Sequence, residues 1–240
     1  MDIFDSIIKE TCADVEKWDP KRWEYKSDKC WKTTSTNEIV FLRDAAYELG
    51  GSGLPAVSFS CVTTSADIVD KDEVLLVGDD LGQIRADVPF ARIVFLSLFD
   101  ISGDEDEAYK TINALEFLKY RIYPENYMMR IAAVSRREQV RVGKKAVAAG
   151  ISFEKIGNLF IKKFKDDPRV KNVKIMFITR EIEEFVHLLK NAQLTENVTK
   201  ALCHVMEGMS FDCATCGLKP VCDEVEGLRK LHFNRSDGRF

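Results

Sequence analysis

The chain has 240 residues, with 35 lysines and arginines against 39 aspartates and glutamates, and a formal net charge of −4. This composition provides no broad basic surface for a nucleic acid, and no apolar run approaches the roughly 20 residues that a membrane span requires. The acidic start, Met-Asp-Ile-Phe-Asp, lacks the features of a secretory signal. We therefore expect a cytoplasmic protein whose clustered cysteines bind metal rather than form disulfides.

Residues 1–45 are predicted to form a helical and aromatic N-terminal arm. Apolar residues recur at helical spacing near the start, and all three tryptophans, Trp18, Trp23 and Trp31, follow them. The arm either packs these rings against the main domain or presents them to a partner, because tryptophan favours interfaces.

Residues 46–194 alternate between strand-like and helix-like segments and form the predicted main domain. Helices are expected after the acidic run at 104–107, over 153–164 and from Thr179 onward. The prediction is an α+β fold, close to α/β, in which a mixed sheet of about five strands packs against helices. The expected strands are 56–63, 73–77, 91–99, 127–134 and 173–178, with the most apolar, 91–99, in a central position.

The segment Ser-Arg-Arg-Glu at 135–138 has the capping-box pattern and predicts a helix that ends at Gly150. On such a helix Arg137, Arg141 and Lys145 are four residues apart and share one face. This basic face is suited to the phosphates of a nucleotide-like cofactor or to an acidic partner such as a ferredoxin. The alternative is a solvated helix surface.

Residues 195–240 are predicted to form a last helix followed by a metal-binding tail. The helix, over 195–206, carries Cys203, and the tail places Cys213, Cys216 and Cys222 in the pattern C-x2-C-x5-C. Four thiolates suit a 4Fe–4S cluster or tetrahedral zinc, and the spacing does not choose between them. The alternative is a set of unrelated thiols.

Four short motifs precede the cysteines in a characteristic order. They are Glu48-Leu-Gly-Gly, Val74-Leu-Leu-Val-Gly-Asp-Asp-Leu81, Val140-Arg-Val-Gly-Lys-Lys-Ala-Val147 and Val173-Lys-Ile-Met-Phe-Ile-Thr179, followed by the C-x2-C. In this order the stretch 46–222 resembles the front portion of the acetyl-CoA synthase (beta) subunit of the carbon monoxide dehydrogenase/acetyl-CoA synthase complex, in which a C-x2-C begins a nickel–iron–sulfur centre.

The resemblance implies that Cys213 and Cys216 are cluster ligands. Cys222 follows them more closely than the corresponding cysteine of the family, and Cys203 is our substitute for a fourth ligand that the family carries downstream. The Cys-Gly-Cys segment that holds the family's nickel has no counterpart in the 240 residues, so we expect a truncated relative without that site.

Together these observations predict an iron–sulfur protein that serves as a subunit, or as an accessory or electron-transfer module, in anaerobic one-carbon metabolism rather than as a stand-alone enzyme. Its expected partner is a protein of the carbon monoxide dehydrogenase or corrinoid type. The first alternative is a non-enzymatic interaction module with a structural zinc site. The second is a coenzyme A-binding acetyl-transfer subunit whose basic residues would be Arg137, Arg141 and Lys145.

Overall fold

A five-stranded mixed sheet forms the centre of the protein. The computed structural model describes residues 2–51, 53–65, 67–99, 105–132, 137–183 and 185–206. In the sheet, two parallel pairs, β3 with β5 and β4 with β8, are joined by antiparallel pairing of β5 with β8, and β1 adds to β4 at one edge. The order is β1-β4-β8-β5-β3, with β1 at Lys21–Glu24, β3 at Ala56–Thr63, β4 at Glu73–Val77, β5 at Phe90–Leu98 and β8 at Val170–Ile178.

The inner strands of this sheet are nearly continuous apolar runs. Every residue of β3, β4 and β5 is buried, as expected for strands that are covered on both faces. The predicted α+β class and mixed sheet of five strands are thus confirmed. β5 is an interior strand as expected, although the middle position belongs to β8.

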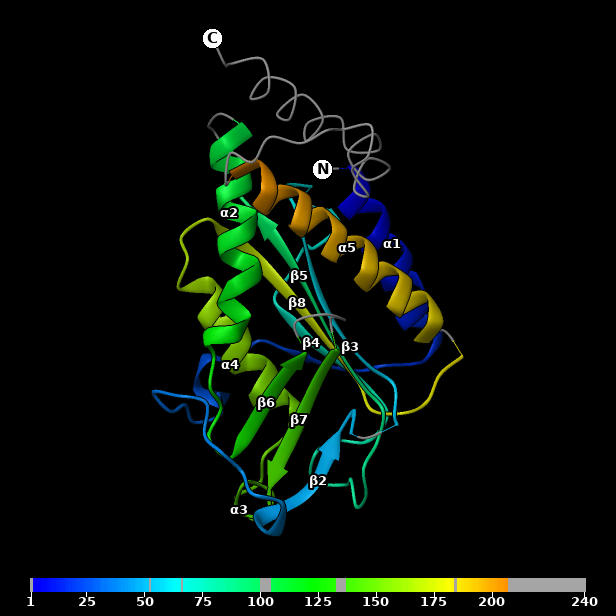
Figure 1. Ribbon diagram of the computed structural model, residues 1–240, viewed down its shortest axis with the longest axis vertical. Helices are drawn as coiled ribbons and strands as arrows, with labels where there is room; N and C mark the ends of the chain where they lie inside the picture. The colour runs from blue at the N-terminus through cyan, green and yellow to red at the C-terminus, as the bar shows by residue number, and fades with distance from the viewer. Residues whose placement is uncertain are drawn as a thin grey trace.

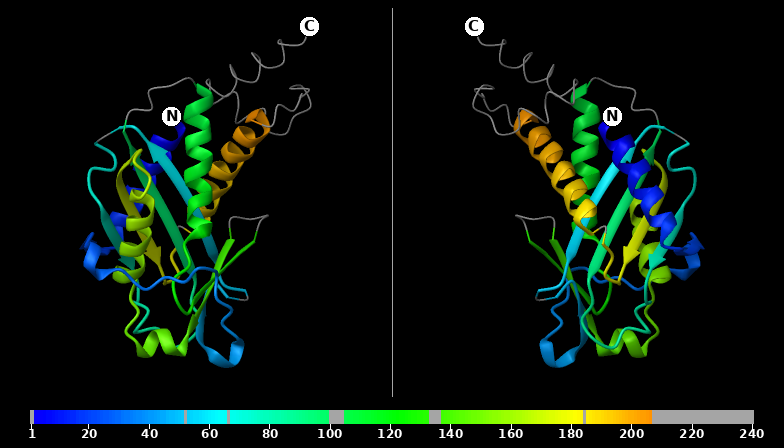
Figure 2. Two further views of the ribbon diagram at one scale, coloured as in Figure 1. Left: turned by 90° about the vertical axis from the view of Figure 1, so that its left-hand side faces the viewer. Right: turned by 90° about the vertical axis from the view of Figure 1, so that its right-hand side faces the viewer.

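Helices cover both faces of the sheet. Figure 1 shows α2 (Glu105–Leu118) and α4 (Phe153–Lys165) on the left of the strands, and α1 (Asp2–Lys17) and α5 (Phe185–Met206) on the right. The two side views of Figure 2 agree, because each pair of helices stands in front of the sheet in one of them. None of the helices in the described part of the chain is long and apolar enough to cross a membrane.

The aromatic residues near the N-terminus pack against this core. The indole of Trp31 is buried, and its Nε1 donates a hydrogen bond of 2.9 Å to the carbonyl oxygen of Glu125. Trp18 and Trp23 are partly buried against the same core. Trp31 thus contributes to the core, whereas Trp18 and Trp23 keep part of their surface exposed.

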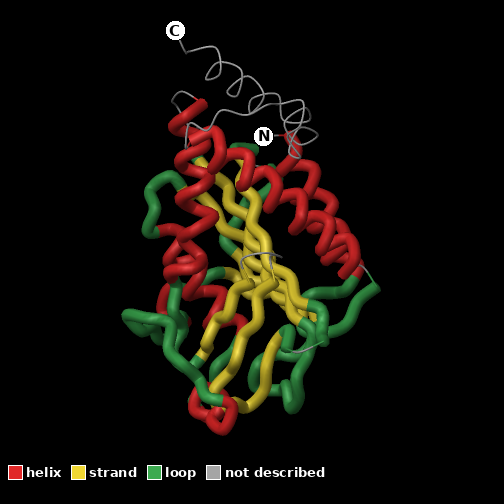
Figure 3. Tube along the Cα trace, in the orientation of Figure 1, coloured by secondary structure: helices red, strands yellow, loops and turns green. Residues whose placement is uncertain are grey.

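A second, three-stranded antiparallel sheet lies beside the lower part of the first (Figure 3). Its order is β2-β7-β6, with β2 at Ala45–Leu49, β6 at Tyr127–Ala132 and β7 at Arg137–Gly143. The predicted strand at 127–134 is confirmed as β6, but it pairs with β7 rather than joining the main sheet.

The helix predicted to run from the capping pattern at 135–138 to Gly150 is wrong over most of its length. Residues 137–143 form strand β7, and only Lys144–Ala148 form a short helix, α3. Glu138, Val140 and Val142 are buried in alternation with more exposed residues. This period of two, together with branched valine side chains, favours a strand over a helix.

The C-terminal part of the described chain is also more continuous than expected. The helices predicted from Thr179 and over 195–206 are a single helix, α5. Thr179 does not cap it: its hydroxyl donates a hydrogen bond of 2.8 Å to the carbonyl oxygen of Asp79, at the end of β4. Thr195 lies inside the helix, where its hydroxyl donates to the carbonyl oxygen of Ala192.

Candidate functional sites

The predicted cluster ligands lie at and beyond the end of α5. Cys203 is in the last turn of this helix, and the other three candidates, Cys213, Cys216 and Cys222, fall outside the described residues. Among the described residues there is no group of three or more His, Cys, Asp or Glu that could hold a metal ion. A metal centre would therefore include residues outside the described ranges, where three of the four predicted cysteine ligands lie.

The other described cysteines are poor alternatives as ligands. Cys12 and Cys30 are free thiols, and Cys61 is buried inside β3. Burial raises the pKa of both the Cys12 and the Cys30 thiol. Since the thiolate is the form that binds metal, a raised pKa disfavours binding at either position.

The predicted basic helix face does not form. Arg137 and Arg141 belong to strand β7, and Lys145 lies on the separate helix α3. The guanidinium of Arg141 is held 2.6 Å from the carboxylate of Glu48 and donates a hydrogen bond of 2.8 Å to the carbonyl oxygen of Val40. Lys145 is exposed. Arg141 is thus engaged within the protein. Of the two predicted residues whose side chains are described, Arg141 and Lys145, the lysine is therefore the more accessible cation.

A buried ion pair joins the two sheets. Arg92 of β5 and Glu138 of β7 are fully buried, with Nη2 of the arginine 2.5 Å from the glutamate oxygen. The same guanidinium stacks on the ring of Phe160 in α4, 4.4 Å from its centroid. Nearby, burial raises the pKa of the Tyr127 hydroxyl well above its usual value, and the Glu138 charge acts in the same direction.

The sequence did not predict the Arg92–Glu138 pair, although the position of Arg92 indicates that it needs a partner. It is the one charged residue in the predicted strand 91–99. A charge in a fully buried strand requires a partner, because an unpaired buried charge is very costly. The identity of that partner was hidden because residues 137–143 were expected to be helical.

A second buried network surrounds Lys119, which follows α2 in the short 3-10 turn Lys119–Arg121. Its Nζ lies 2.7 Å from a carboxylate oxygen of Glu116 and 3.2 Å from the hydroxyl of Ser60 in β3. That hydroxyl in turn donates to the other Glu116 oxygen. Burial lowers the pKa of Lys119 to about 8, and the charge of Arg92 adds to this effect. All three side chains are buried, so the network serves packing and charge balance.

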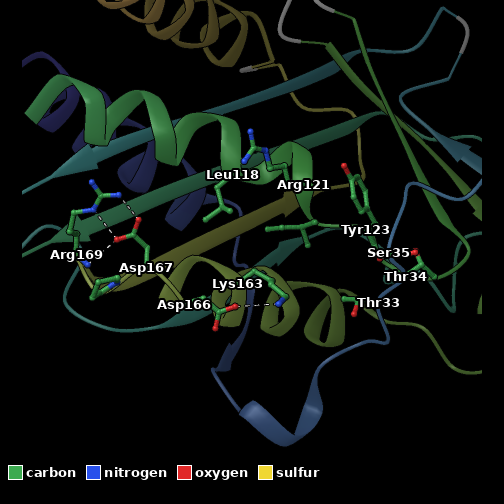
Figure 4. A pocket seen from close by; sticks show the side chains of 12 residues that line it. Thr33, Thr34, Ser35, Leu118, Arg121, Tyr123, Lys163, Asp166, Asp167 and Arg169 are labelled. Carbon is green, nitrogen blue, oxygen red and sulfur yellow. Dashed lines mark hydrogen bonds and ion pairs between the residues drawn. The ribbon is translucent and has the colours of Figure 1, made fainter. Parts of the chain in front are cut away.

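An open cleft of about 690 Å³ lies between the ends of α2 and α4. Leu118 and the ring of Tyr123 lie on one side, Ile122 also lines the cleft, and the opposite side carries charged residues (Figure 4). The remaining lining residues are Thr33, Thr34, Ser35, Arg121, Lys163, Asp166, Asp167, Pro168 and Arg169.

The charges that line this cleft are largely paired with one another. Lys163 lies 3.2 Å from Asp166, and Arg169 lies 2.6 Å from Asp167. The hydrogen bond from Arg169 holds the pKa of Asp167 below its usual range. Arg121 points away from these pairs in Figure 4. The cleft therefore suits a small polar molecule better than a strongly charged one, and its lining residues form no nucleophile–base pair.

Comparison with known proteins identifies one family. A family model described as the CO dehydrogenase/acetyl-CoA synthase complex beta subunit matches residues 34–184. The matched range contains both buried ion clusters and nearly all of the cleft, whereas β1, α5 and the four candidate cysteines lie outside it. No curated protein matches the chain.

Proposed function

The chain belongs to the CO dehydrogenase/acetyl-CoA synthase complex beta-subunit family, and from this premise we propose that it is an iron–sulfur subunit or accessory module of such a complex. The observation that carries the proposal is the order of parts: a family domain over 34–184, one further helix, and then Cys213 and Cys216 in a C-x2-C. Its place would be in anaerobic one-carbon metabolism, beside a CO dehydrogenase or corrinoid protein.

The proposed ligands of a 4Fe–4S cluster are Cys203, Cys213, Cys216 and Cys222. When bound, such a cluster supplies one-electron transfer. The contribution of the chain itself is to supply the thiolates, with Cys203 carried on a helix of 22 residues. Leu188, Ala192 and Val198 bury the inner face of that helix, so the backbone at Cys203 continues from a packed element.

Metal analysis tests this proposal directly. The full chain is purified without oxygen, and its iron, sulfide and zinc are measured together with an EPR spectrum of the reduced protein. We expect about four iron atoms per chain, as a 4Fe–4S cluster requires. Cys216→Ser should lose most of the iron, whereas Cys30→Ser, a change at a half-buried thiol outside the ligand set, should retain it.

Stoichiometric zinc without iron would contradict the iron–sulfur proposal. It would favour the interaction module with a structural zinc site, because zinc accepts the same four thiolates. Equal iron content in Cys216→Ser and in the wild-type protein would show that the C-x2-C does not hold the cluster.

Coenzyme A binding is a separate proposal. It rests on the accessible ammonium of Lys145 and on Arg137, since Arg141 is already engaged with Glu48. Titration calorimetry with coenzyme A should show binding that Lys145→Glu weakens and Lys190→Glu, a change at an exposed lysine of α5, does not. If the wild-type protein binds no coenzyme A, the acetyl-transfer role is excluded.

A further inference from the structure

An apolar turn protrudes at the lower end of the molecule, between α3 and the start of β2 (Figure 1). We propose that this turn, residues 39–43, is a docking tip for an acidic surface on another protein of the complex. Ile39 and Leu42 are each 73% exposed and Phe41 is 58% exposed. Three large apolar side chains are thus exposed within four residues, whereas an ordinary surface exposes such residues singly.

The backbone of the tip is held in place, so the exposure is a built feature of the fold. Val40 is buried between the exposed residues, and its carbonyl oxygen accepts a hydrogen bond of 2.8 Å from Arg141. Its N–H lies 3.3 Å from the sulfur of Met128 in β6. The 3-10 turn Leu42–Asp44 is closed by the N–H of Asp44, which donates to the carbonyl oxygen of Phe41. A rigid tip loses little conformational entropy on binding.

Two cations lie beside the apolar side chains. Arg43 is 84% exposed at its side chain and lies over the ring of Phe41, 5.7 Å from its centroid, and its Nε lies 3.6 Å from a carboxylate oxygen of Asp44. Lys144 is exposed and donates a hydrogen bond of 2.9 Å to the carbonyl oxygen of Arg43. Arg43 and Asp44 balance each other, so Lys144 gives the tip an excess positive charge on a chain with a net charge of −4.

The positive charge beside the apolar residues favours a partner with an acidic surface. An apolar centre with a basic rim is complementary to an apolar hollow with an acidic rim. An anionic bilayer offers similar chemistry, but the acidic remainder of the chain opposes a close approach to it. The choice of a protein also rests on the proposed function, because the family is that of a complex subunit. The partner to be tested is thus the CO dehydrogenase component of the same organism.

The test compares two matched pairs of surface substitutions. In Ile39→Ser/Leu42→Ser the apolar centre of the tip is removed. In Val186→Ser/Leu189→Ser an apolar pair of α5, 57% and 43% exposed, is removed from another surface as the control. A third variant, Lys144→Glu, reverses the charge beside the apolar residues. Binding of each full-length protein to immobilised CO dehydrogenase component is measured by biolayer interferometry at low and high salt.

We expect the tip variant to bind at least about tenfold more weakly than the wild-type protein. The α5 control should bind like the wild-type protein. The charge-reversal variant should differ from the wild-type protein mainly by a lower association rate constant at low salt, because exposed charges act on the rate of encounter. Circular dichroism confirms that each variant is folded.

Each other result overturns the inference in a distinguishable way. If all variants bind equally well, the tip is not the docking surface, while the proposed function stands. If the wild-type protein does not bind, the choice of partner fails, and the iron measurement still decides the iron–sulfur part of the proposed function. Tip-dependent flotation with phosphatidylglycerol vesicles would identify a membrane surface as the occupant, and a tip-dependent dimer in analytical ultracentrifugation would identify a second copy of the chain.

Discussion

At the scale of single residues, the fully buried pair of Arg92 and Glu138 makes the strongest demand on the fold. Removing one partner of such a pair leaves the other charge buried without compensation. We expect Arg92→Met to lower the free energy of unfolding by about 3–5 kcal/mol, measured by urea denaturation.

The double variant Arg92→Met/Glu138→Leu separates the two contributions. If the cost is an uncompensated carboxylate, removing Glu138 as well should restore most of the stability, because an apolar pair of similar volume can replace a buried ion pair. A double variant as unstable as Arg92→Met alone would assign the loss to the packing of Arg92 on Phe160 instead.

Lys119 should make stability depend on pH. In the folded protein its pKa is about 8, against 10.5 for an ordinary lysine side chain. Between these two values the unfolded chain binds more protons than the folded one, so the free energy of unfolding should rise with pH. The gain over this range is at most about 3 kcal/mol.

The contribution of Lys119 is best measured as a difference. Burial raises the pKa of Tyr47 and of the Cys12 thiol, and such groups lower stability as pH increases. Chemical denaturation of the wild-type protein and of Lys119→Met between pH 7.5 and 9.5 removes this shared background. The wild-type protein should gain stability relative to Lys119→Met across this interval, and parallel curves would show that Lys119 stays charged in the fold.

At the scale of elements, the packing of α4 on the main sheet depends on one glycine. A Cβ atom at Gly157 would lie 2.5 Å from Cγ2 of Val74 in β4. In a helix alanine is favoured over glycine by about 1 kcal/mol, but here the clash should win. We expect Gly157→Ala to cost about 1–3 kcal/mol of unfolding free energy, measured by thermal or urea denaturation.

Two further variants check this interpretation. Gly82→Ala is the control, because a Cβ there would meet no atom within 4 Å, and its stability should stay close to that of the wild-type protein. Val74→Ala in the background of Gly157→Ala should recover part of the loss. If Gly157→Ala is as stable as the wild-type protein, α4 is free to move away from the sheet.

The elements that could be predicted are those with a strong local pattern. β3 and β4 have the predicted bounds, because short, largely apolar runs that contain β-branched residues favour a strand over a helix or a loop. α4 was also predicted, and the hydroxyl of Ser152 caps it by accepting from the N–H of Lys155. β7 was not, because the local pattern at 135–138 resembles a helix start and only pairing with β2 and β6 stabilises the strand.

The candidate sites were less predictable, because they depend on contacts between distant residues. Arg141 was expected to be free for a ligand, but Glu48 lies 93 positions away in sequence and neutralises it. The cleft combines residues around positions 33, 120 and 166. No local sequence pattern specifies these long-range contacts, since they follow from the order of the strands in the sheet. The family, in contrast, could be inferred from the order of short motifs, and the match over 34–184 confirms it.

At the scale of the whole molecule, the position of β8 has a consequence for how the protein is made. β8 lies between β4 and β5, yet it begins only at Val170. During synthesis β4 and β5 emerge from the ribosome well before the strand that joins them. The strand edges that β8 will pair with therefore stay unpaired until it is synthesised. Long-range strand pairing of this kind forms slowly and leaves aggregation-prone surface exposed in the meantime.

A pair of stalled nascent chains makes this consequence measurable. Chains arrested with residues 1–168 outside the ribosome should remain sensitive to protease in β4 and β5, and chains with residues 1–206 outside should be protected. Protection at 1–168 would mean that the two halves of the sheet fold before β8 arrives. Otherwise the cell must keep about two thirds of this chain from aggregating until its central strand is synthesised, so a requirement for chaperones is built into the strand order.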